Sequence, residues 1–213
     1  MFSENHCERQ TKNDPLSDFI NVMADLIDEV IALEGSPAVG DRCDCFNGER
    51  TTRCVECPIN ELKCDSCFLA KHDDMPFHHA EKWNGSFFAK GSQCQLGRVI
   101  YVGHGSKPCP LTSPPQMLTV VDVTGIHTCR IMYCSCGKAS DGEGSNVVEK
   151  WRQLVRVGLI PASIRSPATA CTIPMLKQHH LLNTVGKLST MDYATTLRRL
   201  TNGSSPLSVP VRM

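Results

Sequence analysis

The chain has 213 residues, with 41% hydrophobic and 6% aromatic side chains, which suffices for one large core or two small ones. Its formal net charge is zero, and no charge-poor apolar run reaches about 18 residues, which argues against a strongly basic DNA-binding protein and against a membrane span. The first twelve residues are polar and show no secretion signal, so we expect an intracellular, reducing location, nuclear or cytoplasmic, for the 13 cysteines.

Charge is unevenly distributed along this neutral chain. Residues 1–40 contain eight acids and two bases, a balance of −6, and residues 41–145 contain twelve acids and eleven bases, a balance of −1. Residues 146–213 contain two acids and nine bases, a balance of +7. This basic C-terminal third could contact phosphates, or it could form a solvated surface or pair with the acidic N-terminus.

Residues 15–34 are predicted to form one amphipathic helix, preceded by a tail. Asp14 is a suitable N-cap, Pro15 suits the first helical position, and Gly35 is a stop signal. The apolar positions that follow helical spacing are Leu16, Phe19, Ile20, Met23, Leu26, Ile27, Val30 and Ile31. This stripe should pack on the rest of the chain or on a partner helix.

Eight potential metal ligands in four pairs lie between residues 43 and 78. The pairs are Cys43 with Cys45, Cys54 with Cys57, Cys64 with Cys67, and His72 with His78. A Cys-x-x-Cys turn lets two thiolates reach one tetrahedral ion, so eight ligands predict two closed zinc sites. The intervening loops are too short for an independent core, and metal should therefore supply much of the folding free energy. Disulfides or free thiols are the alternative, which the two histidines and the reducing location disfavour.

Two pairing schemes are compatible with this segment. In a sequential scheme the first two pairs share one ion, whereas in a cross-brace scheme pairs one and three share an ion, as do pairs two and four. We favour the cross-brace because interleaving ties together a segment with such short loops. A short helix is expected at 65–72, and the spacing resembles B-box zinc modules. Residues 36–82 are thus predicted to be a binuclear zinc module.

Residues 83–203 are predicted to form an α+β domain, and residues 204–213 a loose tail. The expected strands are 98–102, 117–123 and 126–133. The last two should form a hairpin around Thr124-Gly125, which is a good tight-turn sequence. The expected helices are 146–157, 174–185 and 189–201. The fold class is therefore α+β, built of small zinc-stabilised modules and a three-strand sheet with C-terminal helices.

A third metal site is predicted around Cys134-x-Cys136, with Cys109 as a further ligand. The fourth ligand is either His104 or His127. In an extended strand His127 lies about 23 Å from Cys134 at a rise of about 3.3 Å per residue, at the turn end of the hairpin. His104 and Cys109 should both lie near the open end. We therefore predict His104, Cys109, Cys134 and Cys136, which brings the expected total to about three structural Zn²⁺ ions.

From Gly35 onward the chain resembles the CxC-type-two cysteine-cluster region of KDZ (Kyakuja–Dileera–Zisupton) transposases. The similar residues are 64–67, His72, His78, 81–88, 96–97, 103–104, 108–110, 121–127, 134–136, 159–162, 167–170, 180–182 and 192–202. The resemblance implies a zinc-stabilised module ahead of a catalytic domain, recognising transposon-end DNA or a protein partner. The family's catalytic domain, an RNase-H-like fold with three acidic residues and divalent metal, lies beyond this region, so we expect a non-catalytic module.

Three functions are therefore compared. A zinc-held module that binds DNA or a protein is favoured, because closed four-ligand sites leave no open position for catalysis. A metal-dependent nuclease or transposase would need Asp122 as its first carboxylate, but no acidic triad can be assembled around it, and a turn-stabilising role is simpler. A B-box-like interaction scaffold would use the helix at 15–34 for self-association or partner binding.

Overall fold

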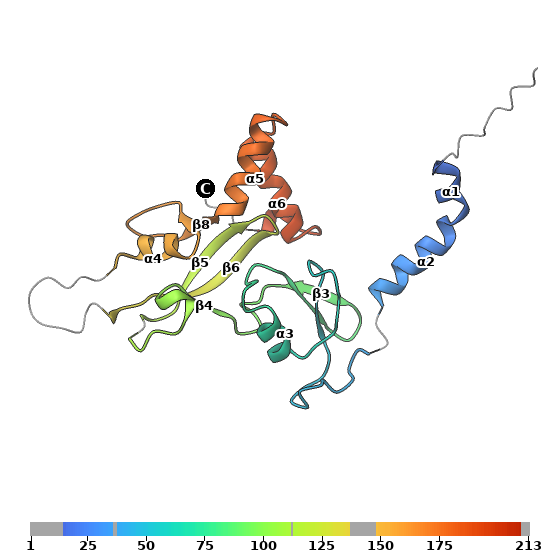
Figure 1. The fold of residues 1–213 in the computed structure, drawn as a ribbon, viewed down its shortest axis with the longest axis horizontal. Helices are drawn as coiled ribbons and strands as arrows, with labels where there is room; N and C mark the ends of the chain where they lie inside the picture. Colours follow the sequence, from blue (N-terminus) through green and yellow to red (C-terminus); the bar gives the residue numbers. More distant parts are fainter. Residues whose placement is uncertain (1–14, 36–37, 112, 137–147, 210–213) are drawn as a thin grey trace, which may run out of the picture. The chain divides into compact units, whose positions relative to one another are not determined.

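The structure is a computed structural model that describes residues 15–35, 38–111, 113–136 and 148–209. The chain divides into two compact units, Met1–Ala38 and Val39–Met213 (Figure 1). The fold is α+β, as predicted, with two sheets in the second unit. Of the helices in the described residues, none combines the length and the apolar character that crossing a membrane needs.

The first unit contains two helices where one was predicted. They are α1 (Pro15–Asn21) and α2 (Met23–Glu34), and the chain leaves helical geometry at Val22, where ψ is 8°. Gly35 ends α2, as expected, because its backbone is extended, with ψ at 157°, although its N–H still donates to the carbonyl of Ile31 at 3.3 Å. Asp14, the predicted N-cap, lies outside the described residues. Described side chains of both helices are exposed.

A three-stranded antiparallel sheet, which the sequence analysis did not predict, organises residues 52–91. Its strands are β1 (Thr52–Cys54), β2 (Ala80–Trp83) and β3 (Phe88–Gly91), in that order. Helix α3 (Asp65–Lys71), predicted at 65–72, packs on this sheet through the buried Phe68. Only Cys54, Phe68 and Ala80 form the buried cluster here. The sheet extends past residue 82, the predicted end of the zinc module, to Gly91.

A five-stranded mixed sheet forms the centre of the remaining chain. Its strands are β4 (Val99–Tyr101), β5 (Gln116–Asp122), β6 (Gly125–Met132), β7 (Leu159–Pro161) and β8 (Thr169–Thr172). Their order is β4-β6-β5-β8-β7, and β5 and β6 form the predicted antiparallel hairpin with Asp122 opposite Gly125. The predicted three-strand sheet is therefore incomplete. It lacks β8, which pairs parallel with β5, and the edge strand β7.

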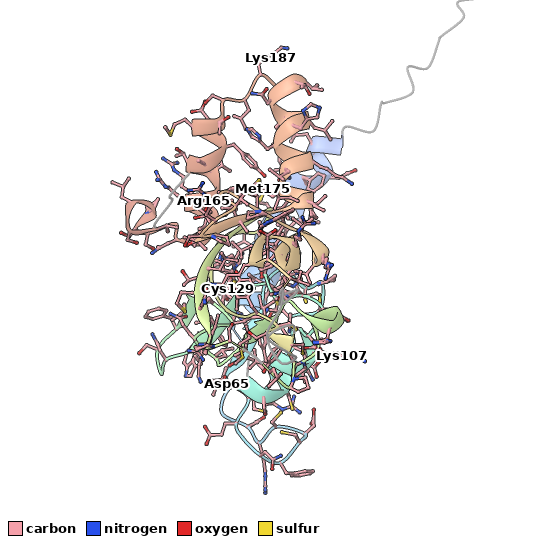
Figure 2. The ribbon with its side chains drawn as sticks, turned by 90° about the vertical axis from the view of Figure 1, so that its left-hand side faces the viewer. Asp65, Lys107, Cys129, Arg165, Met175 and Lys187 are labelled. Carbon is pink, nitrogen blue, oxygen red and sulfur yellow. The ribbon has the colours of Figure 1, made fainter. Side chains whose placement is uncertain are left out.

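Helices cover both faces of this sheet (Figure 1). Helix α4 (Lys150–Arg156) packs through Leu154 on the face that carries Cys129. Helices α5 (Ile173–Thr184) and α6 (Thr190–Thr201) pack on the opposite face, where Met175 is buried. Cys129 and Met175 mark these two cores in Figure 2.

The C-terminal helices begin near the predicted residues, and their caps explain where. Thr172 accepts a hydrogen bond from the Met175 N–H at the start of α5, and Ser189 accepts one from the Asp192 N–H at the start of α6. Helix α4 is shorter than the predicted 146–157, because the backbone is still extended at Glu149. Within the expected loose tail at 204–213, Val209 is buried in the core below α6 after a 3₁₀ turn at Pro206–Ser208, whereas Leu207 is exposed.

Candidate metal centres

The twelve predicted ligands come together in three groups of four. In each group the potential ligand atoms all lie within 4.8 Å of one another. Cluster 1 consists of Cys43, Cys45, Cys64 and Cys67, cluster 2 of Cys54, Cys57, His72 and His78, and cluster 3 of His104, Cys109, Cys134 and Cys136. Clusters 1 and 2 are interleaved along the chain, which is the cross-brace arrangement rather than the sequential one.

Cluster 1 joins a tight loop to the start of α3. The loop closes through the Cys43 N–H, which donates to the carbonyl of Gly48 at 2.8 Å, and it presents Cys43 and Cys45 together. Cys64 is the N-cap residue of α3. The Sγ atoms of Cys45 and Cys64 lie 3.4 Å apart, and the Cys64 N–H points at the Sγ of Cys43 at 3.5 Å.

Cluster 2 joins the end of β1 to the end of α3 and to the loop before β2. The Nε2 of His72 lies 3.3 Å from the Sγ of Cys57, and the Nδ1 of His78 lies 3.4 Å from the Sγ of Cys54. The Nδ1 of His72 is 2.9 Å from the carbonyl of Phe68. An N–H donated there fixes the tautomer that leaves Nε2 free to bind an ion.

Cluster 3 lies where the open end of the β5–β6 hairpin meets a short 3₁₀ turn, His104–Ser106. The Nε2 of His104 is 3.2 Å from the Sγ of Cys134 and 3.3 Å from that of Cys136, and Cys109 completes the group. His127 lies elsewhere, because the hairpin register places it opposite Val120, near the turn. The structure therefore brings His104, and not His127, to this cluster.

All three donor sets suit zinc. A tetrahedral ion with Zn–S bonds of about 2.3 Å separates its sulfur ligands by about 3.8 Å. The potential ligand atoms of each cluster all lie within 4.8 Å of one another, and the sulfur pairs of clusters 1 and 3 come as close as 3.4 and 3.1 Å. Thiols packed this closely cannot all ionise without a cation. In cluster 1 a hydrogen bond from Ser66 lowers the pKa of Cys64 to about 6, whereas the adjacent Cys45 thiol raises the pKa of Cys67 to about 12. A divalent ion removes this conflict, since it holds every thiol as thiolate.

The family comparison agrees with this geometry. Residues 94–205, just over half of the chain, match the family described as "CxC2 like cysteine cluster associated with KDZ transposases". The chain belongs to this family. Comparison with curated proteins and with solved structures gives no match. The segment that matches the CxC2-like family contains cluster 3. Clusters 1 and 2 precede this segment, although we expected the resemblance to begin at Gly35 and to include them.

Two buried glutamines position ligand-bearing loops of clusters 2 and 3, and neither was predicted from the sequence. Gln93 is 2% exposed and donates from Nε2 to the carbonyls of Met75 and His78, at 2.8 and 3.0 Å. Gln153 is 3% exposed, accepts from the Cys134 N–H at 2.8 Å and donates to the Cys134 carbonyl at 3.1 Å. Each side chain replaces water around a loop that carries a metal ligand.

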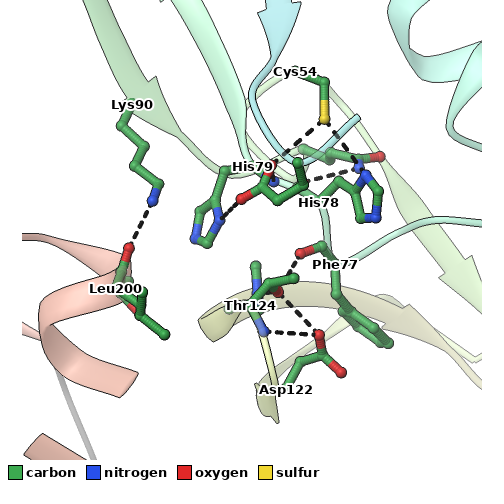
Figure 3. Close-up of polar contacts among 12 residues, drawn as sticks. Cys54, Phe77, His78, His79, Lys90, Asp122, Thr124 and Leu200 are labelled. Atoms are coloured by element: carbon green, nitrogen blue, oxygen red, sulfur yellow. Dashed lines mark hydrogen bonds and ion pairs between the residues drawn. The ribbon is translucent and has the colours of Figure 1, made fainter. Parts of the chain in front are cut away.

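A second missed group links cluster 2 of this CxC2-like protein to the β5–β6 turn (Figure 3). Glu56, which lies between two ligands, binds the Nδ1 of His79 at 2.7 Å and its backbone N–H at 3.1 Å. Burial alone would raise the pKa of Glu56. The hydrogen bond and the charge of His79 outweigh burial and lower the pKa of Glu56 to about 2. The ring of His79 contacts that of His127 in a tilted arrangement, with centroids 4.5 Å apart and 36° between the ring planes. The adjacent doublet His78-His79 was the available sequence signal.

Asp122 has the turn-stabilising role that the sequence analysis favoured. Its carboxylate accepts from the Thr124 N–H at 3.2 Å and from the hydroxyls of Thr124 and Thr172, at 2.9 and 2.6 Å. The metal-binding groups found among the described residues do not include it. In this CxC2-like cluster the carboxylate is therefore engaged in holding the hairpin turn and the start of α5 together.

Proposed function

We propose that the chain is a zinc-stabilised, non-catalytic module that binds DNA. The observation that carries the proposal is the closure of its three metal sites. Each has four Cys or His ligands, a number that saturates tetrahedral zinc and leaves no position for substrate or water. Each ion would join segments distant in sequence, as in cluster 3, where His104 meets Cys134 and Cys136. The ions are accordingly assigned structural roles.

The DNA-binding part of the proposal is supported by the family's association with transposases and by charge. The nine bases and two acids of residues 146–213 can attract a polyanion although the whole chain is neutral. Transposon-end DNA is the partner that the family suggests, and a nuclear location follows from that partner.

Two measurements test this proposal. Metal analysis of the full chain should give three zinc ions per molecule, and a value of two would confine zinc to residues 43–78. DNA affinity of the zinc-loaded protein should fall steeply with salt, because bound phosphates release counterions. Absent or salt-independent binding would contradict the proposal. So would Mg²⁺-dependent nicking of DNA that the Asp122→Ala substitution abolishes.

A protein-interaction scaffold is the second candidate, and the apolar face of α2 favours it. Leu26, Ile27 and Val30 are all exposed, a pattern typical of a helix that meets a partner. Self-association of the full chain, measured by sedimentation, separates the two functions. If the Leu26→Glu variant loses association but keeps DNA affinity, this helix serves assembly alone.

A further inference from the structure

A groove of about 1020 Å³ lies beside the exposed part of the five-stranded sheet. Met117 and Arg130 line it from directly opposed positions on β5 and β6. Further along the same sheet face the opposed pair Val121 and Ile126 is buried against α6. One wall is the β2–β3 turn with β3, and the other is the end of α6 at Thr201 with residues 202–204 that follow it. We call this space the basic groove.

The charges of the basic groove are of one sign. Lys90 and Arg130 line it, and none of its lining residues is Asp or Glu. The Lys90 Nζ lies 2.6 Å from the carbonyl of Leu200, which is neutral (Figure 3). Glu81, opposite Lys90 in the strand register, binds Arg53 at 3.0 Å. Among the described residues the side chain of Arg130 has no hydrogen bond or ion pair, so a polyanion could engage both cations without breaking an ion pair.

Apolar side chains accompany these cations. Phe87 is 61% exposed at the rim of the groove, on the β2–β3 turn, and Met117 is 56% exposed within it. Proteins that bind single-stranded nucleic acid combine aromatic side chains, which stack on unpaired bases, with a basic groove, whose cations contact the phosphate backbone. Duplex DNA offers phosphates but keeps its base faces stacked inside the helix.

We propose that the basic groove binds a single-stranded DNA segment, with Lys90 and Arg130 on its phosphates and Phe87 stacked on a base. This inference rests on the proposed DNA-binding function and adds to it a contact site whose two cations lie outside residues 146–213, together with the form of the DNA. A DNA strand lying across β6 would contact Arg130 on the sheet and Lys90 on the wall formed by β3.

The test uses the full, zinc-loaded chain and fluorescence anisotropy with a labelled single-stranded oligonucleotide, its duplex and the RNA of the same sequence. The groove variant is Lys90→Gln with Arg130→Gln. The control is Lys63→Gln with Lys71→Gln, which removes the same charge from two lysines that pair with Glu61 outside the groove. Zinc content and thermal unfolding establish that each variant is folded.

We expect the groove variant to lose at least tenfold in single-strand affinity and to lower the salt slope by about 1.4, or about 0.7 for each lost phosphate contact. The exposed Phe87→Ala should weaken binding about tenfold without altering the slope. The control should bind like the wild type.

Other outcomes overturn separate parts of the inference. If the groove variant binds as the wild type does, the groove is wrong but the DNA-binding function stands. Tighter binding of the duplex or of RNA overturns the single-stranded DNA assignment. If the zinc-loaded wild type binds no nucleic acid, the proposed function fails together with this inference.

Discussion

The side-chain amide of Gln93 donates a hydrogen bond to the carbonyl oxygen of His78 at 3.0 Å. Because Gln93 also binds the Met75 carbonyl and accepts from Arg98 at 3.1 Å, it closes the loop that carries the last ligand of cluster 2. A buried amide with all its partners in place preorganises a metal ligand without touching the ion.

Replacing this amide should weaken both the fold and cluster 2. Gln93→Leu removes the side-chain donor from both carbonyls, and among the described residues only the Met75 carbonyl keeps another partner, the His78 N–H at 3.3 Å. The lost hydrogen bonds should lower the free energy of unfolding by about 2 kcal/mol. Zinc affinity, measured by competition with a chelator, should fall for one ion of the three. Gln95→Leu is the matched control, since Gln95 is exposed and its side chain, among the described residues, accepts one hydrogen bond, from the Ser92 N–H. Equal effects of the two substitutions would refute the positioning role of Gln93.

Removing the metal should affect the two sheets differently. The three-stranded sheet has a buried cluster of only three residues, one of which is the ligand Cys54, whereas the cluster between α4 and one face of the five-stranded sheet has nine buried residues. A chelator should therefore abolish amide hydrogen-exchange protection in β1, β2 and β3 and leave most of it in β5 and β6. Zinc-saturated chelator is the control. Full protection of β1–β3 in the metal-free chain would show that packing alone holds this sheet.

Gly103 is required by its close approach to cluster 3. A Cβ at this position would lie 2.5 Å from the Cβ of Cys134, although the backbone conformation is one that any residue adopts. Gly103→Ala should therefore displace the Cys134 turn and release one zinc ion per chain to a competing chelator. Gly35→Ala, whose added Cβ meets nothing closer than 3.9 Å, should retain all the zinc. If the Gly103→Ala variant keeps all its zinc, the loop can shift to accept the added Cβ without weakening metal binding at cluster 3.

The grouping of the twelve ligands was accessible from sequence because short loops and an extended strand restrict which ligands can meet. The choice of His104 over His127 depended only on strand rise and hairpin register, and the observed register agrees. Zinc binding by these residues stays a prediction. Strand β8 was missed because its three-residue pairing with β5 joins Thr119 to the distant Thr169. The roles of Gln93 and Gln153 arise from tertiary contacts that no local pattern marks, and that of His79 was signalled only by its position next to the ligand His78.

His127 should make stability depend on pH. It is 3% exposed, its Nε2 lies 2.9 Å from the Thr124 hydroxyl, and burial together with the neighbouring His79 lowers its pKa to about 3. Asp122 and Glu56 oppose this shift and Lys90 adds to it. Below pH 6.5, the ordinary pKa of histidine, His127 is protonated in the unfolded chain but stays neutral in the folded chain. The stabilisation is therefore complete above that pH and is lost progressively as the pH falls toward 3.

The measurement compares wild type with His127→Gln, which stays neutral and can still bond to Thr124. Both proteins keep the same twelve cluster residues, so protonation of those groups cancels in the difference between their unfolding free energies. That difference should shrink by about 1 kcal/mol for each pH unit between pH 6 and 4, and it should be constant above pH 7. A difference that does not change across the series would mean that His127 takes up its proton in the folded state at its ordinary pKa, and that burial does not hold it neutral.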